Sequence, residues 1–337
     1  MSERAGTSSR QPLVSIGLPV YNGSNYIELA IESILGQTLT DFELIITDNA
    51  STDGTEVICR RYAAREPRIR YHRNERNLGA GANFNRCFEL AAGKYFKWAA
   101  HDDTLAPTYL ERCVEVLEAN PDAVLCQSLV RLIDARGNAV GVYDSELRGA
   151  DSASPADRFV ALVISTHWCT ETFGLIRTAA LARTRLIAPY FASDRALCAE
   201  LALLGRCLQV PEPLFMNRDH PERCVRAAYP DRRTVRHWYL PGADRPSLVD
   251  LCPMWSLYAE YWRMVRRHVP DLGQRLRCYG HLVRWLGVYW NAVRLLLEPV
   301  SALDPRVLAI AVDVKHRLFG AARVALVSDS GERLRHR

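Results

Sequence analysis

The 337-residue sequence has no uninterrupted apolar run of about 18 residues, so a membrane-spanning helix is not expected. The opening residues, MSERAGTSSRQP, lack the apolar segment of a secretory signal, and we expect a disordered lead over residues 1–11. The ten cysteines form no Cys-x-x-Cys pair, which argues against a zinc site. Isolated cysteines among apolar residues are typical of small core side chains in a reducing compartment, which indicates the cytoplasm.

Two nucleotide-binding signatures are also missing. The sequence contains no Walker A motif. Gly79 and Gly81 begin a G-x-G-x-x-N pattern that lacks the third glycine of a dinucleotide-binding fingerprint and does not follow the first expected strand. A Rossmann-type dinucleotide site is therefore poorly supported.

The composition is that of an ordinary globular protein, with 48% hydrophobic and 24% charged residues. The formal net charge is +5, and the basic excess lies largely in the arginine-rich second half. This charge fits an anionic small ligand, an anionic membrane surface or a nucleic acid, and does not choose among them. The length allows one large domain with an appendage, or two domains.

The first part of the chain alternates strand and helix patterns. Apolar runs predict strands at residues 14–20, 42–47, 69–72, 95–99 and 124–133. Helical spacing fills the gaps between them, and Asn25 with Glu28 resembles a capping box at the first helix. Further strand-like segments cover residues 172–177 and 211–216. This order predicts an α/β fold with a Rossmann-like, mostly parallel sheet flanked by helices.

Polar clusters follow three of the expected strands: Tyr21-Asn22, Asp48-Asn49 and His101-Asp102-Asp103. In parallel sheets, ligands bind beyond the carboxyl ends of the strands. Adjacent carboxylates at such a place bind a divalent cation, act as an acid and a base, or hold ligand hydroxyls. The alternative is a solvated turn in which Asp102 caps the following helix.

Three segments together resemble family 2 glycosyltransferases of the GT-A fold, a group that includes bacterial, inverting enzymes dependent on nucleotide sugars. They are VSIGLPVYNGSNYIELAIESILGQ, FELIITDNASTDGT and NERNLGAGANFNRCFELAAGKYFKWAAHDD, and the match covers residues 12–135. The resemblance implies a GT-A catalytic domain at 12–235, with a nucleotide-sugar-binding half at 12–135 and an acceptor-side half at 136–235. A helical region at 250–327 and a disordered tail at 328–337 would complete the chain.

The resemblance also assigns the donor site. Asp48 would accept the uracil N3 proton. In the metal motif, Ala100 replaces the usual first acid. The expected ligands of Mg²⁺ or Mn²⁺ are Asp102 and His220, with Asp103 as second choice. The full set of expected nucleotide-sugar-binding residues is Pro19, Tyr21, Asn22, Asp48, Arg76, Asn77, Gly79, Asn85 and Asp102.

The catalytic base implied by the family is Asp194, in Ser193-Asp194-Arg195, with Ser193 as a helix N-cap. The alternative is that Asp194 is only a favourable acid in a first helical turn. Trp168 and Glu171 would face the acceptor. Three arginines could neutralise diphosphate charge or form a solvated basic loop: Arg218, Arg223 and Arg226.

The C-terminal part repeats tryptophan, tyrosine and leucine at helical spacing, with arginines between them. Three interpretations remain open: a helical subdomain on the catalytic domain, a homodimer surface, or a basic helix at the inner face of a membrane. No nucleic-acid partner is expected.

The leading prediction is therefore an inverting glycosyltransferase that uses a nucleotide diphosphate sugar, with a UDP-sugar as the expected donor. Its acceptor would be a saccharide, a lipid-linked glycan, a natural product or a peptide. A nucleotidyltransferase is the second hypothesis, but it would need a glycine-rich basic loop after the first strand, where the sequence has Leu18-Pro19-Val20-Tyr21-Asn22. A nucleotide-binding protein without catalysis is the third.

Overall fold

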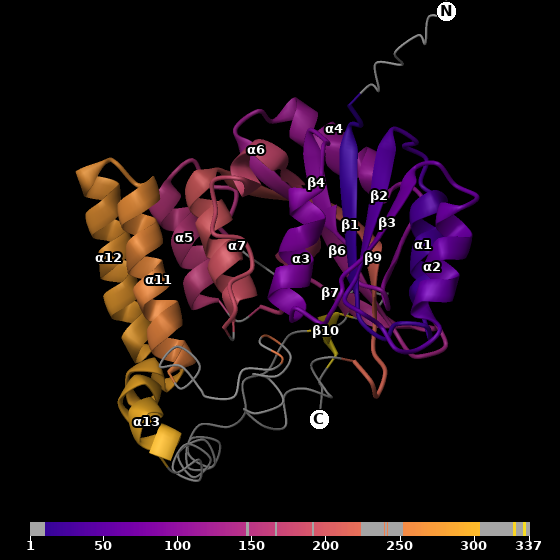
Figure 1. Cartoon of the computed structure of the whole chain (residues 1–337). Coiled ribbons are helices and arrows are strands. Elements are labelled where there is room, and N and C mark those ends of the chain that lie inside the picture. Colours follow the sequence, from indigo (N-terminus) through magenta and orange to yellow (C-terminus); the bar gives the residue numbers. More distant parts are fainter. Residues whose placement is uncertain are drawn as a thin grey trace, which may run out of the picture.

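The computed structural model describes residues 11–145, 148–165, 167–190, 192–223, 239, 241, 252–303, 326–327 and 333–334. Helices flank a central sheet, and a group of C-terminal helices lies at one side of the molecule (Figure 1). The strands of the main sheet are ordered β11-β10-β7-β6-β8-β4-β1-β2-β3, and β9 joins through β5 and β6.

One half of the sheet is parallel. Its four strands are β1 (Val14–Val20), β2 (Phe42–Asp48), β3 (Ile69–Arg73) and β4 (Tyr95–Trp98). All residues of β1 and β2 are buried, because helices cover both faces of a parallel sheet. These helices are α1 (Ile27–Leu35), α2 (Thr55–Ala63) and α3 (Ala80–Glu89). The predicted alternation of strands and helices is confirmed here.

The other half of the sheet is mixed. After β5 (Thr104–Leu105) and α4 (Tyr109–Ala119), the long strand β6 (Ala123–Ile133) pairs in parallel with β9 (Arg206–Arg218) and antiparallel with β7 (Ala139–Tyr143). Strand β8 (Leu175–Arg177) lies antiparallel between β4 and β6. The helical elements of this half are α5 (Pro155–Ile164), η1 (Thr170–Phe173), α6 (Thr178–Leu181) and α7 (Ser193–Leu204).

Some local predictions were wrong. The strand expected at residues 172–177 is reduced to β8, because residues 170–173 form a 3₁₀ turn. Helix α1 is capped by Tyr26 without a side-chain hydrogen bond, so Asn25 and Glu28 form no capping box. Helix α7 begins at Ser193, and its N-cap is Ala192 in a left-handed conformation. Ser193 therefore does not cap this helix.

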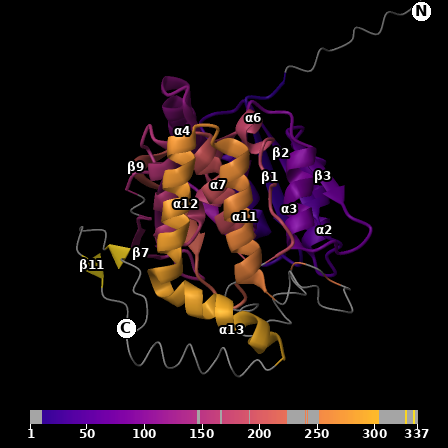
Figure 2. The same cartoon turned by 90° about the vertical axis from the view of Figure 1, so that its left-hand side faces the viewer.

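Three long C-terminal helices complete the described fold: α11 (Pro253–His268), α12 (Leu272–Gly287) and α13 (Asn291–Leu303). A 3₁₀ turn, η2 (Val288–Trp290), connects the last two, and short strands β10 (Leu326–Val327) and β11 (Arg333–Leu334) extend the sheet. Helices α11 and α12 stand side by side, with α13 crossing below them (Figure 2). The helical prediction for this region is confirmed over residues 253–303.

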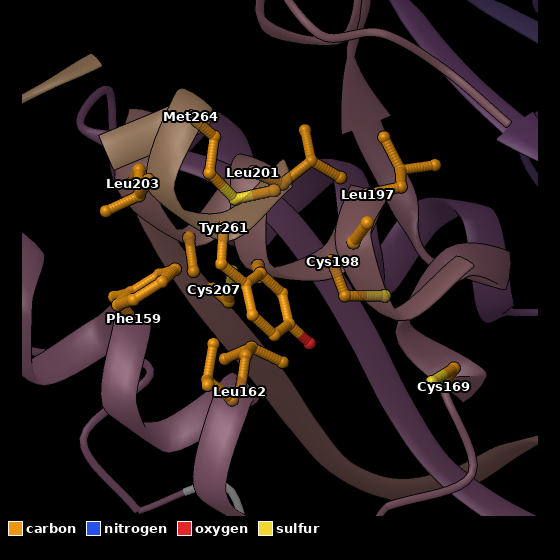
Figure 3. Packing of buried hydrophobic residues seen from close by; sticks show 14 of the residues in the cluster. Phe159, Leu162, Cys169, Leu197, Cys198, Leu201, Leu203, Cys207, Tyr261 and Met264 are labelled. Atoms are coloured by element: carbon orange, nitrogen blue, oxygen red, sulfur yellow. The ribbon is translucent and has the colours of Figure 1, made fainter. Parts of the chain in front are cut away.

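The C-terminal helices share a hydrophobic core with α5 and α7. Tyr261 and Met264 of α11 lie among Phe159 and Leu162 of α5 and Leu201 of α7 (Figure 3). A second buried cluster lies between β1, β2 and the helices α1 and α4. The interface places α11 directly behind α7, the helix that carries Asp194.

No helix in the described residues is long and apolar enough to cross a membrane. The nine cysteines in the described ranges form no disulfide with one another, and all but Cys252 are buried. Most of the predicted core cysteines are therefore confirmed, whereas Cys224 lies outside the described residues, as do residues 1–10 of the lead and most of the C-terminal tail.

Candidate active site

The predicted polar clusters lie at one edge of the sheet. Val20 pairs with Asp48 at the end of β1 and β2, and β4 runs parallel to β1 in the same direction. The turns that follow are tight, since Asn22 and Ala50 both have positive φ angles, of 51° and 62°. Asn22 stabilises the pair of turns by accepting a hydrogen bond from the backbone N–H of Thr52 at 2.8 Å.

Asp48 is completely buried at this edge. Its carboxylate accepts hydrogen bonds from the Tyr71 hydroxyl at 2.6 Å, the Arg73 guanidinium at 3.1 Å and the backbone N–H of Ser51 at 2.8 Å. Tyr71 and Arg73 come from β3 and were not singled out in the sequence. They compensate the negative charge that a buried carboxylate carries, and they fix the direction of its remaining lone pairs.

A network of amide side chains extends from Asp48 to α3. Asn49 donates to the Asn77 side chain at 2.7 Å and accepts from Asn74 at 3.1 Å. Asn74 in turn donates to Asn83, which donates to the carbonyl of Thr47 in β2. Asn74 and Asn83 were not predicted, although they stand in the same segment as Asn77.

The remaining nucleotide-site predictions occupy different environments. Pro19 is buried in β1, whereas Tyr21 and Arg76 are exposed. Gly79 has a φ angle of 87°, and a side chain there would meet the carbonyl oxygen of Tyr239 at 2.1 Å. Asn85 points away from the amide network, because its side chain holds both the N–H and the C=O of Ile187.

Asp102 and His220 lie together beyond the end of β4. The Nε2 atom of His220 is 3.0 Å from Oδ2 of Asp102, and both side chains are largely buried. His101 approaches from the other side, with Nδ1 3.9 Å from Oδ1 of Asp102. Tyr26, the N-cap residue of α1, was not predicted; it packs against the His220 ring at a centroid distance of 4.8 Å.

The neighbouring acid, Asp103, has a different environment. It is buried and accepts hydrogen bonds from the Asn217 side chain at 3.1 Å and the backbone N–H of Arg218 at 2.8 Å, both in β9. Burial and the nearby Asp102 charge raise the pKa of Asp103 to about 7. The two acids thus divide their roles: Asp103 connects β9 to the end of β4, and Asp102 faces His220.

The Arg218 side chain contacts backbone oxygens and an aromatic ring close to Asp102. Its guanidinium donates to the carbonyl of Asp102 at 2.9 Å and to the carbonyls of Asp134 and Ala135, and it lies over the Tyr26 ring at 4.8 Å. The backbone N–H of Arg223 donates to the carbonyl of His220 at 3.1 Å, and Arg226 lies outside the described residues. The charge of Arg218 is close to Asp102, although its N–H groups are occupied by backbone oxygens.

The side chains present fit a divalent cation that is completed by a ligand. In the described part of the chain, no group of three or more His, Cys, Asp or Glu side chains could hold a metal alone. Asp102 and His220 supply one carboxylate and one imidazole within 3.0 Å of each other. Mg²⁺ and Mn²⁺ are commonly bound by one or two such groups together with phosphate oxygens.

Asp194 lies in the first turn of α7. Its Oδ1 atom accepts a hydrogen bond from the backbone N–H of Arg195 at 2.8 Å. Burial raises the pKa of the Asp194 carboxyl, while the Arg195 N–H and the charges of Arg195 and His167 act in the opposite direction. A raised pKa makes a carboxylate a stronger base than an exposed aspartate.

The two expected acceptor residues differ in exposure. Trp168 is 39% exposed and stacks on Tyr143 with a centroid distance of 4.3 Å. Glu171 is only 1% exposed, and its carboxylate lies 3.0 Å from the His167 ring. Trp168 is therefore available to a ligand, whereas Glu171 is covered and its expected contact with an acceptor does not fit this geometry.

Known proteins match the chain over its first half. The sequence model of the family described as "Glycosyl transferase family 2" matches residues 15–182. Chondroitin synthase of Escherichia coli is 37% identical over 136 residues, which cover 40% of this chain and 20% of that protein. An uncharacterised glycosyltransferase of Methanocaldococcus jannaschii is 38% identical over 138 residues, covering 40% of this chain and 48% of that protein.

The described fold also has solved counterparts. The structure of S. aureus TarS residues 1–349 in complex with UDP-GlcNAc superposes with a TM-score of 0.55 at 17% identity, covering 94% of each chain. This likeness supports the GT-A fold. The matched segments span less than half the length of the two sequence relatives. The family match and the fold agree, and the chain belongs to glycosyl transferase family 2.

Proposed function

We propose that the protein transfers a sugar from a nucleotide diphosphate sugar, with inversion, to a hydroxyl or another nucleophile of an acceptor. The observation that carries this proposal is the Asp102–His220 pair, with its 3.0 Å contact, at the same sheet edge as Asp48 and the amide network. A nucleotide along the ends of β1 and β2 would direct its diphosphate toward β4. This arrangement follows the general rule for ligands of parallel sheets.

The proposed reaction is a direct displacement at the anomeric carbon. The acceptor oxygen forms the new bond as the bond to the diphosphate oxygen breaks, and the nucleoside diphosphate leaves with the electron pair. The acceptor proton goes to the Asp194 carboxylate. Burial of Asp194 supports this role, because it raises the pKa of the carboxyl and thus its basicity.

A divalent cation is part of the proposal. Asp102 and His220 would hold it, and when bound it would neutralise the charge of the leaving diphosphate. Ala100, in place of the first acid of the usual motif, leaves this site with one carboxylate and one imidazole. We therefore expect cation binding to depend strongly on the donor's phosphate oxygens.

UDP is the nucleotide that we propose for the donor. TarS, which shares the fold, was solved with UDP-GlcNAc, and this makes UDP the first nucleotide to test. A thermal-shift screen of UDP, GDP, dTDP and CMP, each with and without Mn²⁺, would identify the base. A nucleotidyltransferase would respond to a nucleoside triphosphate instead, and a protein without catalysis would bind a nucleotide sugar without releasing UDP from it.

Two variants test the site. Asp194→Asn should abolish UDP release from the donor and leave UDP affinity within about twofold, because the base touches the acceptor rather than the nucleotide. Asp102→Ala should weaken Mn²⁺-dependent UDP binding in calorimetry. Asp122→Asn, at an exposed position in the turn before β6, is the matched control. Full activity of Asp194→Asn would contradict its role as base.

For the C-terminal helices, we propose contact with an anionic membrane surface. Residues 253–303 contain seven arginines and three acids, and two of these acids, Glu260 and Glu298, are buried. Large apolar side chains are exposed between the arginines of α11 and α12: Trp255, Trp262, Leu272, Leu276 and Val283. Three of these arginines pair with acids of the chain: Arg263, Arg267 and Arg277. A second copy on this face would bring the other arginines together, whereas anionic headgroups would pair with them.

Vesicle co-sedimentation tests this contact. We expect binding to phosphatidylcholine vesicles that contain phosphatidylglycerol, little binding without it, and loss of binding in Leu276→Glu. Val57→Glu on α2, where the valine is 73% exposed, is the control. Unchanged binding of Leu276→Glu, or a dimer that this substitution dissociates in light scattering, would overturn the proposal.

A further inference from the structure

A buried pair of charged side chains lies beside the N-terminus of α7. His167 and Glu171 are 0% and 1% exposed at their side chains, and Nδ1 of His167 is 3.0 Å from Oε2 of Glu171. The other nitrogen, Nε2, is 3.0 Å from the carbonyl oxygen of Leu162. The proposed glycosyl transfer gives this pair no role so far.

The geometry determines the protonation of the pair. Both ring nitrogens face oxygen acceptors, so each needs a proton, and the short contact between Nδ1 and the carboxylate requires a proton between them. The backbone N–H of Cys169 lies 3.3 Å from Nδ1, a longer contact than that to Glu171. Burial by itself would lower the pKa of His167, but the Glu171 charge, the neighbouring Cys169 and the hydrogen bond to Glu171 together raise it to about 10. An imidazolium and a carboxylate satisfy this arrangement.

Arg195 attaches this pair to the proposed base. Its guanidinium donates to the carbonyl of Ser165 at 3.2 Å and to that of His167 at 2.9 Å. Its backbone N–H donates to the Asp194 carboxylate at 2.8 Å. The residue that follows the proposed base therefore holds the segment that carries His167 against α7.

Arg195 on α7 and His167 and Cys169 on the preceding segment interact electrostatically with Asp194. Four further titratable groups lie next to these three rather than next to the carboxylate: Cys198 on α7, Glu171 in η1, Tyr143 on β7 and Tyr261 on α11. The pKa of Cys169 is well above its usual value, and burial raises those of Tyr143 and Tyr261. Near neutral pH, the charged groups that act on Asp194 are thus Arg195 and His167, and the positive charges of both favour its ionised form.

We infer that His167 and Glu171 are positioning residues, which fix the segment before η1 against α7 and keep the Asp194 carboxylate ionised despite its burial. Glu171 sets the charge of His167, and His167 acts on Asp194 through space. The inference rests on the proposed role of Asp194 and adds to it a source for its charge state. It also replaces the expected acceptor role of Glu171.

The test is an NMR titration of protein labelled at the aspartate side-chain carboxyl, with the Asp194 signal identified by its loss in Asp194→Asn. We expect the titration midpoint of Asp194 to rise by about one pH unit in His167→Gln and in Glu171→Gln. The double variant should fold more readily than either single one, because no unpaired buried charge remains, yet keep the raised midpoint. His281→Gln on α12 is the matched control, and it should leave the titration midpoint of Asp194 unchanged.

The outcomes separate this inference from the proposed function. An unchanged midpoint in the double variant would overturn the inference, and loss of UDP release in Asp194→Asn would still support the base. If Asp194→Asn retains full UDP release, the base assignment fails and the inference fails with it. A raised midpoint, accompanied by an acid limb of kcat/KM that moves to higher pH, would support both.

Discussion

Lys97 in β4 permits a quantitative prediction. Its side chain is fully buried, and its Nζ donates to the carbonyl of Phe173, over the rings of Tyr109 at 4.6 Å and Phe215 at 5.2 Å. Burial lowers the pKa of Lys97 to about 7, while the nearby Cys113 and Asp103 act in the opposite direction. The substitution Lys97→Met keeps the volume, and the Phe173 carbonyl retains the Tyr109 hydroxyl as a donor at 3.2 Å.

The effect on stability follows from proton linkage. A lysine with a pKa of about 10.5 in the unfolded chain and about 7 in the folded one binds an extra proton on unfolding between these pH values. Unfolding is thereby favoured by about 4 kcal/mol at pH 7 and by about 2 kcal/mol at pH 9. Lys97 alone would therefore make the protein about 2 kcal/mol more stable at pH 9 than at pH 7.

His167 has the opposite effect on the pH dependence of the free energy of unfolding. Its folded pKa of about 10 lies above the unfolded value of 6.5, so its stabilising contribution is complete below pH 6.5 and is lost as the pH rises through 10. Between pH 7 and pH 9 this loss is also about 2 kcal/mol. The two contributions nearly cancel in the wild-type protein, and Lys97→Met removes only one of them.

Urea unfolding at pH 7, 8 and 9, followed by tryptophan fluorescence, checks this reasoning. We expect a nearly constant free energy of unfolding for the wild type, and a fall of about 2 kcal/mol for Lys97→Met relative to it. Lys94→Met changes an exposed lysine directly before β4. Its free energy of unfolding should depend on pH as that of the wild type does. Parallel curves for wild type and Lys97→Met would mean that the two aromatic rings keep Lys97 charged, and would refute the argument.

Three further predictions concern packing and the acceptor. Gly79→Ala should lower the free energy of unfolding by at least about 2 kcal/mol in urea, because a side chain would lie 2.1 Å from the carbonyl of Tyr239 at a positive φ. Glu298→Gln should lower the free energy of unfolding by about 1–2 kcal/mol, because this buried carboxylate accepts hydrogen bonds from the first N–H groups of α11. Calorimetry would show the loss as a lower Tm. Trp168→Ala should raise the acceptor KM and hardly change donor binding, because the ring is 39% exposed on Tyr143; an unchanged KM would remove Trp168 from the acceptor site.

The parallel half of the fold could be predicted because its signals are local. Apolar runs and helical spacing give β1 and β2 to within a residue, and the predicted ligand clusters follow them. The mixed half could not be predicted in the same way. The 13-residue strand β9 pairs with β6 more than 70 positions earlier, and no local pattern encodes that pairing or its register.

The positions of the candidate site residues were proposed from the sequence, but their partners were not. Asp102, His220 and Asp194 were assigned from the family resemblance, whereas the groups that set the environment of the candidate site come from distant segments. Tyr71 and Arg73 reach Asp48 from β3, and the pairing of Glu171 with His167 depends on a 3₁₀ turn. Such contacts depend on burial and orientation, which a single sequence does not reveal.

Arg218 has a consequence for engineering this scaffold. One guanidinium bridges the end of β4, the turn after β6 and the ring of Tyr26 in α1. Replacing the exposed turn at residues 134–138 would remove the carbonyl groups of Asp134 and Ala135 from the Arg218 guanidinium. The same guanidinium binds the backbone carbonyl of Asp102, so this contact would be weakened as well. Substituting lysine would keep the charge but could not span these three acceptors at once. Libraries that diversify this turn should therefore hold Arg218 and its carbonyl partners constant.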